Sequence, residues 1–272
     1  MTRMIDKETK ICMSLAARPT NFGTRFHNYL YDALNLNYLY KAFTTNDLGG
    51  AITGIKALGI RGCGVSMPFK QACIPFIDEL DTSASVIHSV NTIVNTDGYL
   101  KGYNTDYIAI ETLLNQYRVP AGLTFALKGS GGMASAVACA LKNHGFTKGY
   151  IIARDDESGQ ALAKSQGFQH STDMTGVTAD VLINATPLGM AGGPESETLA
   201  FSPQEIDAAT VIFDVVALPA ETPLIRYARA HNKAVISGAE VFAIQAVEQF
   251  SLYTGVRPSD DLFASAAAYA RQ

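Results

Sequence analysis

Short hydrophobic runs alternate with helical patterns from the N-terminus to about residue 105. Apolar residues at helical spacing predict one helix through Phe26, Leu30 and Leu34, and a second over 48–58 that Asn46 or Asp47 caps. Two β runs flank Thr96-Asp97-Gly98, a sequence typical of a hairpin turn. Strands are predicted at 10–15, 38–43, 62–67, 91–95 and 100–103. The alternation predicts an α/β domain with a mostly parallel sheet and the hairpin as an antiparallel edge.

The pattern changes after a helix predicted over 105–117 and a break at 119–122. A β run at 123–127 then meets a glycine-rich turn and a helix rich in alanine, predicted over 135–142. Further strands are predicted at 150–153, 181–185, 211–215 and 234–237. This rhythm is typical of a doubly wound parallel sheet. The last part, 240–272, is helical by pattern and has no strand, so it must pack on an existing domain.

Composition narrows the class of protein. The 272 residues predict about two domains, at roughly 150 residues each. With 47% hydrophobic and 17% charged residues, the chain has the composition of a packed globular protein. Its net charge of -4 does not attract a nucleic-acid backbone, and no apolar stretch approaches the roughly 18 residues of a membrane helix. We therefore expect a cytoplasmic protein with no nucleic-acid or membrane partner.

The four cysteines predict no metal site and no disulfide framework. None of them forms a C-x-x-C pair, and each stands among apolar or small neighbours. We expect buried, reduced thiols at Cys12, Cys63, Cys73 and Cys139.

The glycine-rich turn predicts a dinucleotide site. Gly129, Gly131 and Ala134 fit G-x-G-x-x-[GA] between a strand and a helix, with Ser130, Gly132 and Met133 between them. Gly129 permits a tight turn, Gly131 lets the backbone approach a pyrophosphate, and Ala134 lets the helix lie close to the strand. The helix N-terminus offers unpaired N–H groups to the anion. The alternative is an ordinary glycine turn in an α/β sheet.

Arg154 and Asp155, which follow the strand predicted at 150–153, bear on the choice between NADP and NAD. Arg154 can stack on adenine and pair with a 2′-phosphate, which favours NADP. Asp155 can bond a ribose hydroxyl, which favours NAD, and it would repel that phosphate. We favour NADP and keep NAD as a possibility, as well as the alternative that both residues form an exposed loop.

Two further segments carry more polar groups than packing requires. They are 64–70, which contains Ser66 and Lys70, and 102–106, which ends in Asp106. Each lies where a predicted strand meets a helix start, at the edge of a sheet where α/β proteins bind ligands.

These motifs together resemble the shikimate dehydrogenase family. The matching segments are 64–70, 89–92 (Ser-Val-Asn-Thr), 102–106, the glycine turn, 184–190 (Asn-Ala-Thr-Pro-Leu-Gly-Met), 214–216 with 222–224, and 237–238 through 245–246. The resemblance covers essentially the whole chain. It implies an α/β fold with an N-terminal substrate domain, 1–105 completed by helices 240–272, and a Rossmann-type NAD(P)-binding domain, 106–239. It also implies an active site in the cleft between them, a small-molecule substrate and a step of aromatic amino acid biosynthesis. We expect a monomer or homodimer.

The resemblance implies roles for particular residues. Lys70 and Asp106 would be the catalytic pair, while Ser66, Asn91 and Gln245 would contact substrate hydroxyls. Thr186, Met190 and Gly238 would lie beside the cofactor. The chemistry agrees, because oxidation of a secondary alcohol needs a base for the hydroxyl proton while hydride leaves the carbon. Lys70 is expected in a first helical turn that begins at Pro68, where the helix dipole favours the neutral amine.

This sequence departs from the family pattern at the substrate carboxylate. The family's Ser-x-Ser pair is replaced here by Asn21 and Gly23. Arg18 or Arg25 would supply a replacement cation, unless both are ordinary surface charges. Ala217 stands where the family commonly has a tyrosine near the substrate. Position 155, commonly threonine beside the family's adenosine-binding arginine, is Asp155, and Ser158 replaces the family's second arginine. Each lost hydrogen bond to a carboxylate costs about 1.5–3 kcal/mol.

We therefore predict an NADP-dependent oxidoreductase that interconverts shikimate and 3-dehydroshikimate, slow on shikimate or tuned to a related ring acid. One alternative is a dehydrogenase of quinate or another polar hydroxy acid. Another is a non-catalytic, nucleotide-responsive binding protein, against which the presence of both Lys70 and Asp106 argues.

Overall fold

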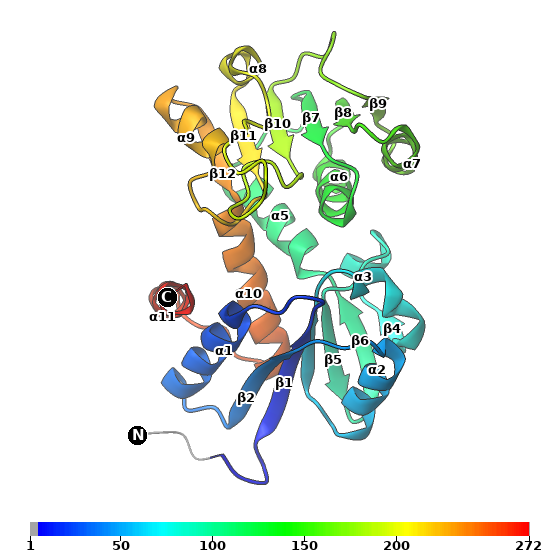
Figure 1. Ribbon diagram of the computed structural model, residues 1–272, viewed down its shortest axis with the longest axis vertical. Helices are drawn as coiled ribbons and strands as arrows, with labels where there is room; N and C mark the ends of the chain where they lie inside the picture. The colour runs from blue at the N-terminus through cyan, green and yellow to red at the C-terminus, as the bar shows by residue number, and fades with distance from the viewer. Residues whose placement is uncertain (1–4, 272) are drawn as a thin grey trace. The chain divides into compact units, whose positions relative to one another are not determined.

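The computed structural model describes residues 5–271, which divide into two compact units (Figure 1). The first unit contains the chain up to Thr105 and again from Ala243 onward, and the second contains Asp106–Phe242. The helix α10 (Gly238–Thr254) therefore begins in the second unit and ends in the first.

The first unit is built on a six-stranded sheet in the order β2-β1-β3-β5-β6-β4. The strands β1, β2 and β3 are parallel, and β5 is antiparallel to both β3 and β6. Their bounds are β1 (Lys10–Leu15), β2 (Tyr38–Phe43), β3 (Gly62–Val65), β4 (Glu79–Leu80), β5 (Thr92–Thr96) and β6 (Tyr99–Tyr103). The predicted hairpin is confirmed as β5–β6, with positive φ at Asp97 and Gly98 as a two-residue hairpin turn requires. Its predicted place at the sheet edge is wrong, because β4 pairs with β6 beyond it and is too short to show a periodicity.

Two hydrophobic clusters cover the two faces of this sheet. On one face Phe26, Leu30 and Tyr31 of α1 pack against Phe250 and Tyr253 of α10. On the other face Ile52 and Ile55 of α2 pack against residues of β1, β3 and β5. The helices are α1 (Asn21–Ala33), α2 (Leu48–Ala57), α3 (Phe69–Ala72), α4 (Thr82–Ser85) and α11 (Asp260–Ala270), with a 3-10 turn at Ile74–Phe76. Asp47 caps α2 as predicted, since its carboxylate accepts the Gly50 N–H at 2.8 Å.

The edge strand β2 is protected by a side chain. The Asn28 amide accepts the Tyr40 N–H at 3.0 Å and donates to the Tyr40 carbonyl at 2.8 Å. The side chain thus satisfies the main-chain groups that a further strand would otherwise pair with.

The second unit contains a parallel six-stranded sheet in the order β12-β11-β10-β7-β8-β9. Numbered within the unit, this is the 3-2-1-4-5-6 order of a dinucleotide-binding fold, so the predicted Rossmann-type architecture is confirmed. The strands are β7 (Phe125–Lys128), β8 (Gly149–Ile152), β9 (Gln169–Ser171), β10 (Val181–Asn184), β11 (Val211–Asp214) and β12 (Ala234–Ser237). The short strand β9 was not predicted.

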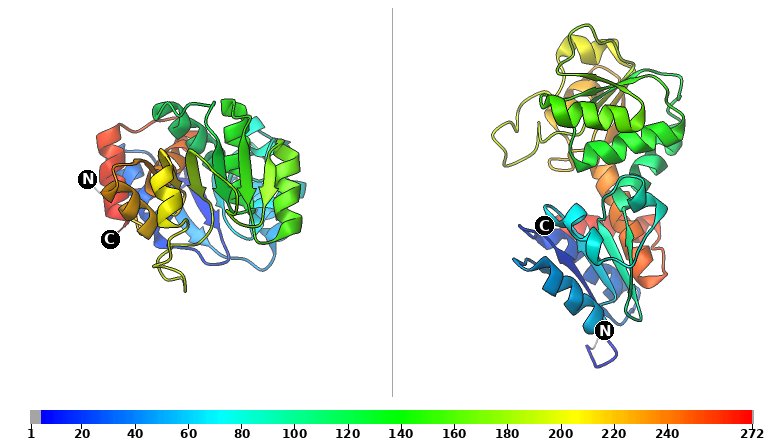
Figure 2. Two further views of the ribbon diagram at one scale, coloured as in Figure 1. Left: turned by 90° about the horizontal axis from the view of Figure 1, so that it is seen from above. Right: turned by 90° about the vertical axis from the view of Figure 1, so that its right-hand side faces the viewer.

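Helices cover both faces of the second sheet (Figures 1 and 2). On one face lie α6 (Gly132–His144) and α7 (Asp156–Gln166), and on the other lie α8 (Pro203–Ala208) and α9 (Pro223–Ala230). Ile206 of α8 and Leu224 of α9 pack against Ala126, Leu182 and Ile212 of the strands. The unit also contains α5 (Thr105–Gln116) from Asp106 onward.

Several local predictions are corrected. The strand β3 ends at Val65, two residues early, and Pro68 is the N-cap of α3 rather than its first residue. Because α3 is a single turn, it has too few aligned peptide dipoles for the effect that we expected on Lys70. The alanine-rich helix is longer than predicted, since α6 begins at Gly132 inside the glycine turn.

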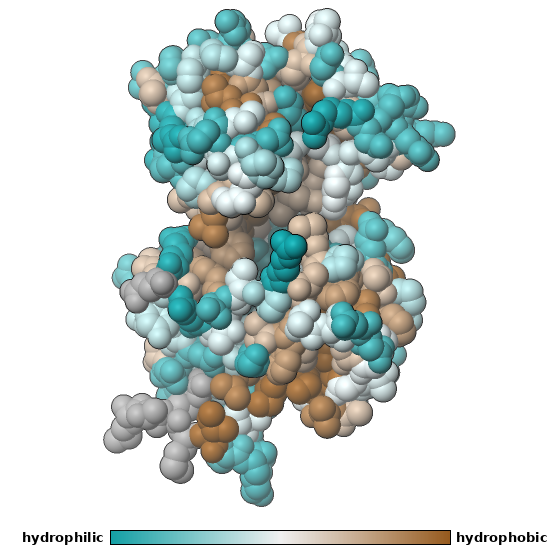
Figure 3. Space-filling view, in the orientation of Figure 1, coloured by the Kyte–Doolittle hydropathy of each residue, from teal (hydrophilic) through white to brown (hydrophobic). Residues whose placement is uncertain are grey.

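Hydrophobic and hydrophilic residues are mixed over the visible face of each unit (Figure 3). Among residues 5–271, no helix combines the length and the apolar character that crossing a bilayer needs.

Candidate functional site

Main-chain hydrogen bonds bring two of the predicted site segments together in the first unit. The Val65 N–H donates to the Asn91 carbonyl at 2.7 Å, and the Val90 N–H donates to the Lys70 carbonyl at 2.8 Å. Lys70 is half-buried on α3, and Ser66 is exposed between β3 and α3. The backbone of Lys70 therefore lies beside the segment that carries Asn91.

Asn91 presents a buried donor that has no partner. The residue is 1% exposed, and its Oδ1 accepts the Thr105 N–H at 2.8 Å. Its Nδ2 makes no hydrogen bond within the described chain. A buried N–H group without a partner costs about 1–3 kcal/mol, so this amide nitrogen is a candidate ligand contact.

The helix α10 brings a second amide to this region. Gln249 donates from Nε2 to Thr92 Oγ1 at 3.0 Å. Gln245 precedes Gln249 by one helical turn and so lies on the same side of α10. The structure thus places Gln245, Asn91 and the backbone of Lys70 in one region of the first unit.

Asn21 and Gly23 lie in the first turn of α1. A Cβ added to Gly23 would lie 3.3 Å from the Tyr40 ring, whose hydroxyl lies close to Gly64 on β3. Gly23 therefore faces the hydrophobic cluster that contains Tyr40, whereas Asn21 is exposed. The substrate role of both residues stays a prediction.

Asp106 is the second residue of α5 and is 4% exposed. It is the first residue of the second unit, whereas Lys70 belongs to the first. The pairing of Lys70 with Asp106 stays a prediction.

The glycine turn has the shape that a pyrophosphate needs. Gly129 has φ +122°, and a Cβ there would lie 3.0 Å from the Ala185 carbonyl, so the position requires glycine. Nothing lies within 4 Å of a Cβ added to Gly131 or Gly132, which leaves open space at the start of α6. Gly131 caps α6 without a side chain, so the first N–H groups of that helix are available to an anion. Ala134 is fully buried, as close packing of helix on strand requires.

The turn after β8 is tied to the glycine turn. Asp155 caps α7 by accepting the Ser158 N–H at 2.7 Å, and this hydrogen bonding lowers the pKa of its carboxyl. Ser158 Oγ lies 2.7 Å from Ser130 Oγ. One oxygen of Asp155 thus has a structural role, and the exposed Arg154 beside it has no ion pair that the described residues provide.

The remaining cofactor candidates lie at the carboxyl edge of the second sheet. Thr186 donates to Asn184 Oδ1 from its hydroxyl at 2.6 Å, and the loop of Met190 is joined to Leu218 by the Ala191 N–H. A Cβ added to Gly238 would overlap the Val216 carbonyl, so the start of α10 requires glycine. The loops after β7, β10, β11 and β12 thus gather at one edge, where doubly wound sheets bind ligands.

Sequence reasoning missed the buried polar groups that hold these loops and amides. Asp214 accepts hydrogen bonds from Thr222 Oγ1 at 2.6 Å and Asn184 Nδ2 at 3.0 Å, while burial raises the pKa of its carboxyl to about 6. Gln249 was missed although it follows Gln245 by four residues, a spacing that places both on one helix face. Within residues 5–271, no cluster of three His, Cys, Asp or Glu side chains is arranged to hold a metal ion.

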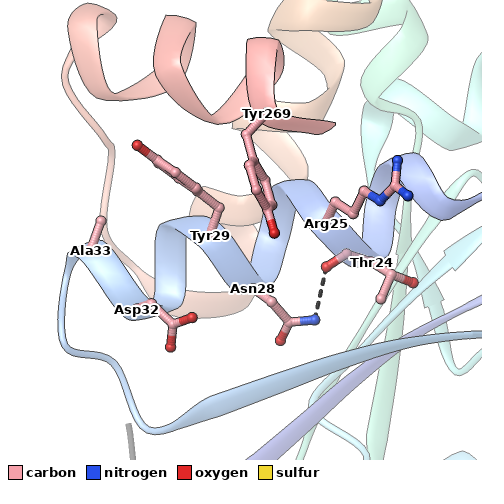
Figure 4. Close-up of a pocket in the computed structure, with 7 residues that line it drawn as sticks. All are labelled: Thr24, Arg25, Asn28, Tyr29, Asp32, Ala33 and Tyr269. Carbon is pink, nitrogen blue, oxygen red and sulfur yellow. Dashed lines mark hydrogen bonds between the residues drawn. The ribbon is translucent and has the colours of Figure 1, made fainter. Parts of the chain in front are cut away.

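A separate cavity of about 560 Å³ lies between α1 and α11 (Figure 4). Of the predicted site residues it is lined by Arg25, a candidate cation for the substrate carboxylate, and by none of the others. Its lining residues include Arg25, Asp32 and the rings of Tyr29 and Tyr269, whose centroids lie 5.2 Å apart.

Several known proteins that are similar to this chain come from one family. The family model of the shikimate dehydrogenase substrate binding domain matches residues 22–93. The shikimate dehydrogenase-like protein of Haemophilus influenzae is 57% identical over 98% of this chain and 99% of its own length. The shikimate dehydrogenase (NADP(+)) of Chlorobium chlorochromatii is 34% identical over 89% of this chain and 90% of its own. The solved structure of quinate dehydrogenase from Corynebacterium glutamicum in complex with NAD has a TM-score of 0.86 at 26% identity, covering 96% of this chain and 98% of that chain.

Proposed function

Because this chain belongs to the shikimate dehydrogenase family, we propose that it interconverts shikimate and 3-dehydroshikimate with NADP. The family consists of oxidoreductases that act on a CH–OH group. One observation supports a polyhydroxy ring acid as the substrate. The Asn91 amide is buried beside the backbone of Lys70, and its nitrogen has no hydrogen-bond partner among the described residues. A ligand hydroxyl satisfies such a nitrogen by accepting its hydrogen bond.

The residues of the chain have distinct proposed roles in the reaction. When bound, NADP would supply the acceptor for the hydride that leaves the carbinol carbon. The amine of Lys70 takes the proton of the same hydroxyl and returns it in the reverse direction. Asp106, in the first turn of α5, is the second ionisable group of the reaction. Asn91, Ser66 and Gln245 bind and orient the hydroxyl groups.

We assign cofactor binding to the second unit. The pyrophosphate would be held by the turn from Gly129 through Ser130, Gly131, Gly132, Met133 and Ala134, and the nicotinamide by the region of Thr186, Met190 and Gly238. The free guanidinium of Arg154 favours NADP, because Asp155 already uses one oxygen to cap α7. We expect Arg154→Gln to weaken NADP binding about tenfold or more and NAD binding little, measured by calorimetry.

The substrate carboxylate subsite supports slow turnover of shikimate. Asn21 and Gly23 offer at most one amide where the family offers two hydroxyls, and each lost bond to a carboxylate costs about 1.5–3 kcal/mol. A second candidate substrate is quinate, favoured by the similarity to the Corynebacterium quinate dehydrogenase. The two differ at the ring carbon that bears the carboxylate, next to the subsite that has changed.

The test is steady-state oxidation of shikimate and quinate with NADP and with NAD, followed by nicotinamide absorbance. We expect turnover of shikimate with NADP, and Lys70→Ala should lower kcat about 10²–10⁴-fold while NADP still binds. Lys7→Ala is the control, because Lys7 is an exposed lysine that pairs with the exposed Glu8. Lack of turnover of both acids with both cofactors would refute the proposed function.

A further inference from the structure

We propose that Gln249 is a positioning residue for substrate recognition, which acts through Thr92 to hold the Asn91 amide in the orientation that leaves its nitrogen open. The proposal rests on the proposed function, where Asn91 binds a substrate hydroxyl. The residues linked by these hydrogen bonds all belong to the first unit. Gln249 lies on α10, far from Asn91 and Thr92 in sequence.

The orientation of the Asn91 amide is fixed by groups that donate to its oxygen. The Thr105 N–H lies 2.8 Å from Oδ1 and can only donate, so the atom facing it is the oxygen. The hydroxyls of Thr92 and Thr105 also donate to Oδ1, at 2.9 and 3.2 Å. The nitrogen is then the free end of the amide, and it has no partner within the described residues.

The direction of the Thr92 hydroxyl depends on Gln249. A threonine hydroxyl rotates freely and points to whichever acceptor is available. Gln249 donates from Nε2 to Thr92 Oγ1 at 3.0 Å, so the hydroxyl hydrogen of Thr92 is left to donate to Asn91 Oδ1. Without this donor, the Thr92 side chain would lose the contact that holds its hydroxyl beside Asn91 Oδ1. If the Gln249 amide were reversed, its oxygen would draw the Thr92 hydroxyl away from Asn91.

Two contacts prevent that reversal. The main-chain oxygen of Asn91 lies 3.5 Å from Gln249 Nε2 and can only accept, so it repels an amide oxygen there. On the other side, Gln249 Oε1 lies 3.3 Å from His27 Nε2. Burial lowers the pKa of His27 to about 3, so the ring is neutral at physiological pH. Its Nδ1 is buried without a partner among the described residues, so the tautomer with the N–H on Nε2 avoids an unpartnered buried N–H and donates to Gln249 Oε1.

The site is packed so that this arrangement is rigid. His27 is stacked on Tyr40 with ring centroids 4.3 Å apart, and Gln249 is only 7% exposed. Gly64 makes room for the glutamine, since a Cβ there would lie 3.1 Å from Gln249 Nε2. The relay from His27 through Gln249 and Thr92 to Asn91 is thus buried throughout.

A kinetic experiment tests whether Gln249 acts through Asn91. We expect Gln249→Met to raise the KM for shikimate about tenfold with little change in kcat, and to have no further effect on KM in an Asn91→Ala background. Thr92→Val should reproduce the rise, and Thr92→Ser, which keeps the hydroxyl, should restore the KM. Effects of Gln249→Met and Asn91→Ala that multiply in the double variant would overturn the relay.

A second measurement does not depend on turnover. In protein labelled with ¹⁵N-asparagine, we expect the Asn91 side-chain NH₂ signals to shift or broaden in Gln249→Met and in Thr92→Val, but not in Thr92→Ser. Signals that stay unchanged in a folded Gln249→Met protein overturn the positioning role. Failure of the wild-type protein to oxidise either acid refutes the proposed function instead, so the two failures are distinguishable.

Discussion

The buried carboxyl of Asp214 should make the stability of the second unit fall as the pH rises. Burial raises the pKa of this carboxyl from 3.8 to about 6, against hydrogen bonds from Thr222, Val216 and Asn184 that favour the carboxylate. The folded state therefore binds the proton more tightly than the unfolded state. The contribution is complete below pH 4 and is lost as the pH rises through 6.

The magnitude follows from the size of the shift. One pKa unit corresponds to 1.36 kcal/mol, so a shift from 3.8 to about 6 amounts to about 3 kcal/mol, of which roughly 2–3 kcal/mol is lost between pH 4 and pH 7.5. Asp214→Asn cannot titrate, and it loses the bond from Thr222 to Oδ2 at a cost of about 1 kcal/mol. The variant should be less stable than the wild type at pH 4 and more stable at pH 7.5.

The assay is hydrogen exchange of peptides from β10 and β11 across a urea series at both pH values, which reports on the second unit alone. Asp207→Asn is the matched control, because Asp207 is exposed on α8. If the difference in free energy of unfolding between Asp214→Asn and the wild type is the same at both pH values, Asp214 is ionised at pH 4 already and the argument from burial is wrong.

Three further predictions concern stability and reactivity. In thermal unfolding, Gly238→Ala should destabilise the second unit by about 1–3 kcal/mol, because a Cβ there overlaps the Val216 carbonyl. In the same measurement Gly132→Ala, whose Cβ meets open space, should leave the stability unchanged or raise it slightly. Asn28→Leu uncovers the main chain of Tyr40 on the edge strand, so it should lower the free energy of urea unfolding of the first unit by about 1–3 kcal/mol and promote self-association, measured by sedimentation. Asn28→Asp keeps the acceptor and should lose less stability. The thiols should react with an aromatic disulfide reagent only after unfolding, and fast reaction of native protein would contradict their burial at Cys12, Cys63, Cys73 and Cys139.

Most of the fold was predictable because the signals are local. Strands such as Lys10–Leu15 and Tyr38–Phe43 appear as apolar runs, and the hairpin turn at Asp97-Gly98 needs only two residues that tolerate positive φ. The strands that were missed, Glu79–Leu80 and Gln169–Ser171, are two and three residues long. Segments this short have no measurable period, and they are strands only because a neighbouring strand pairs with them.

By itself, the sequence determined the chemistry available to this protein: a glycine turn before a helix, a lysine after a strand and amides at fixed places in recognisable motifs. Such features are read from neighbouring residues, so one chain suffices to find them. The tertiary structure alone decided which polar groups are satisfied. Whether the Asn91 amide is locked by Thr105 and Gln249, or Asp214 holds a proton at pH 5, depends on contacts between residues up to 158 positions apart and on the exclusion of water around them. Burial and hydrogen bonding of this kind set the energy of a charge or a free N–H, and no local pattern encodes them.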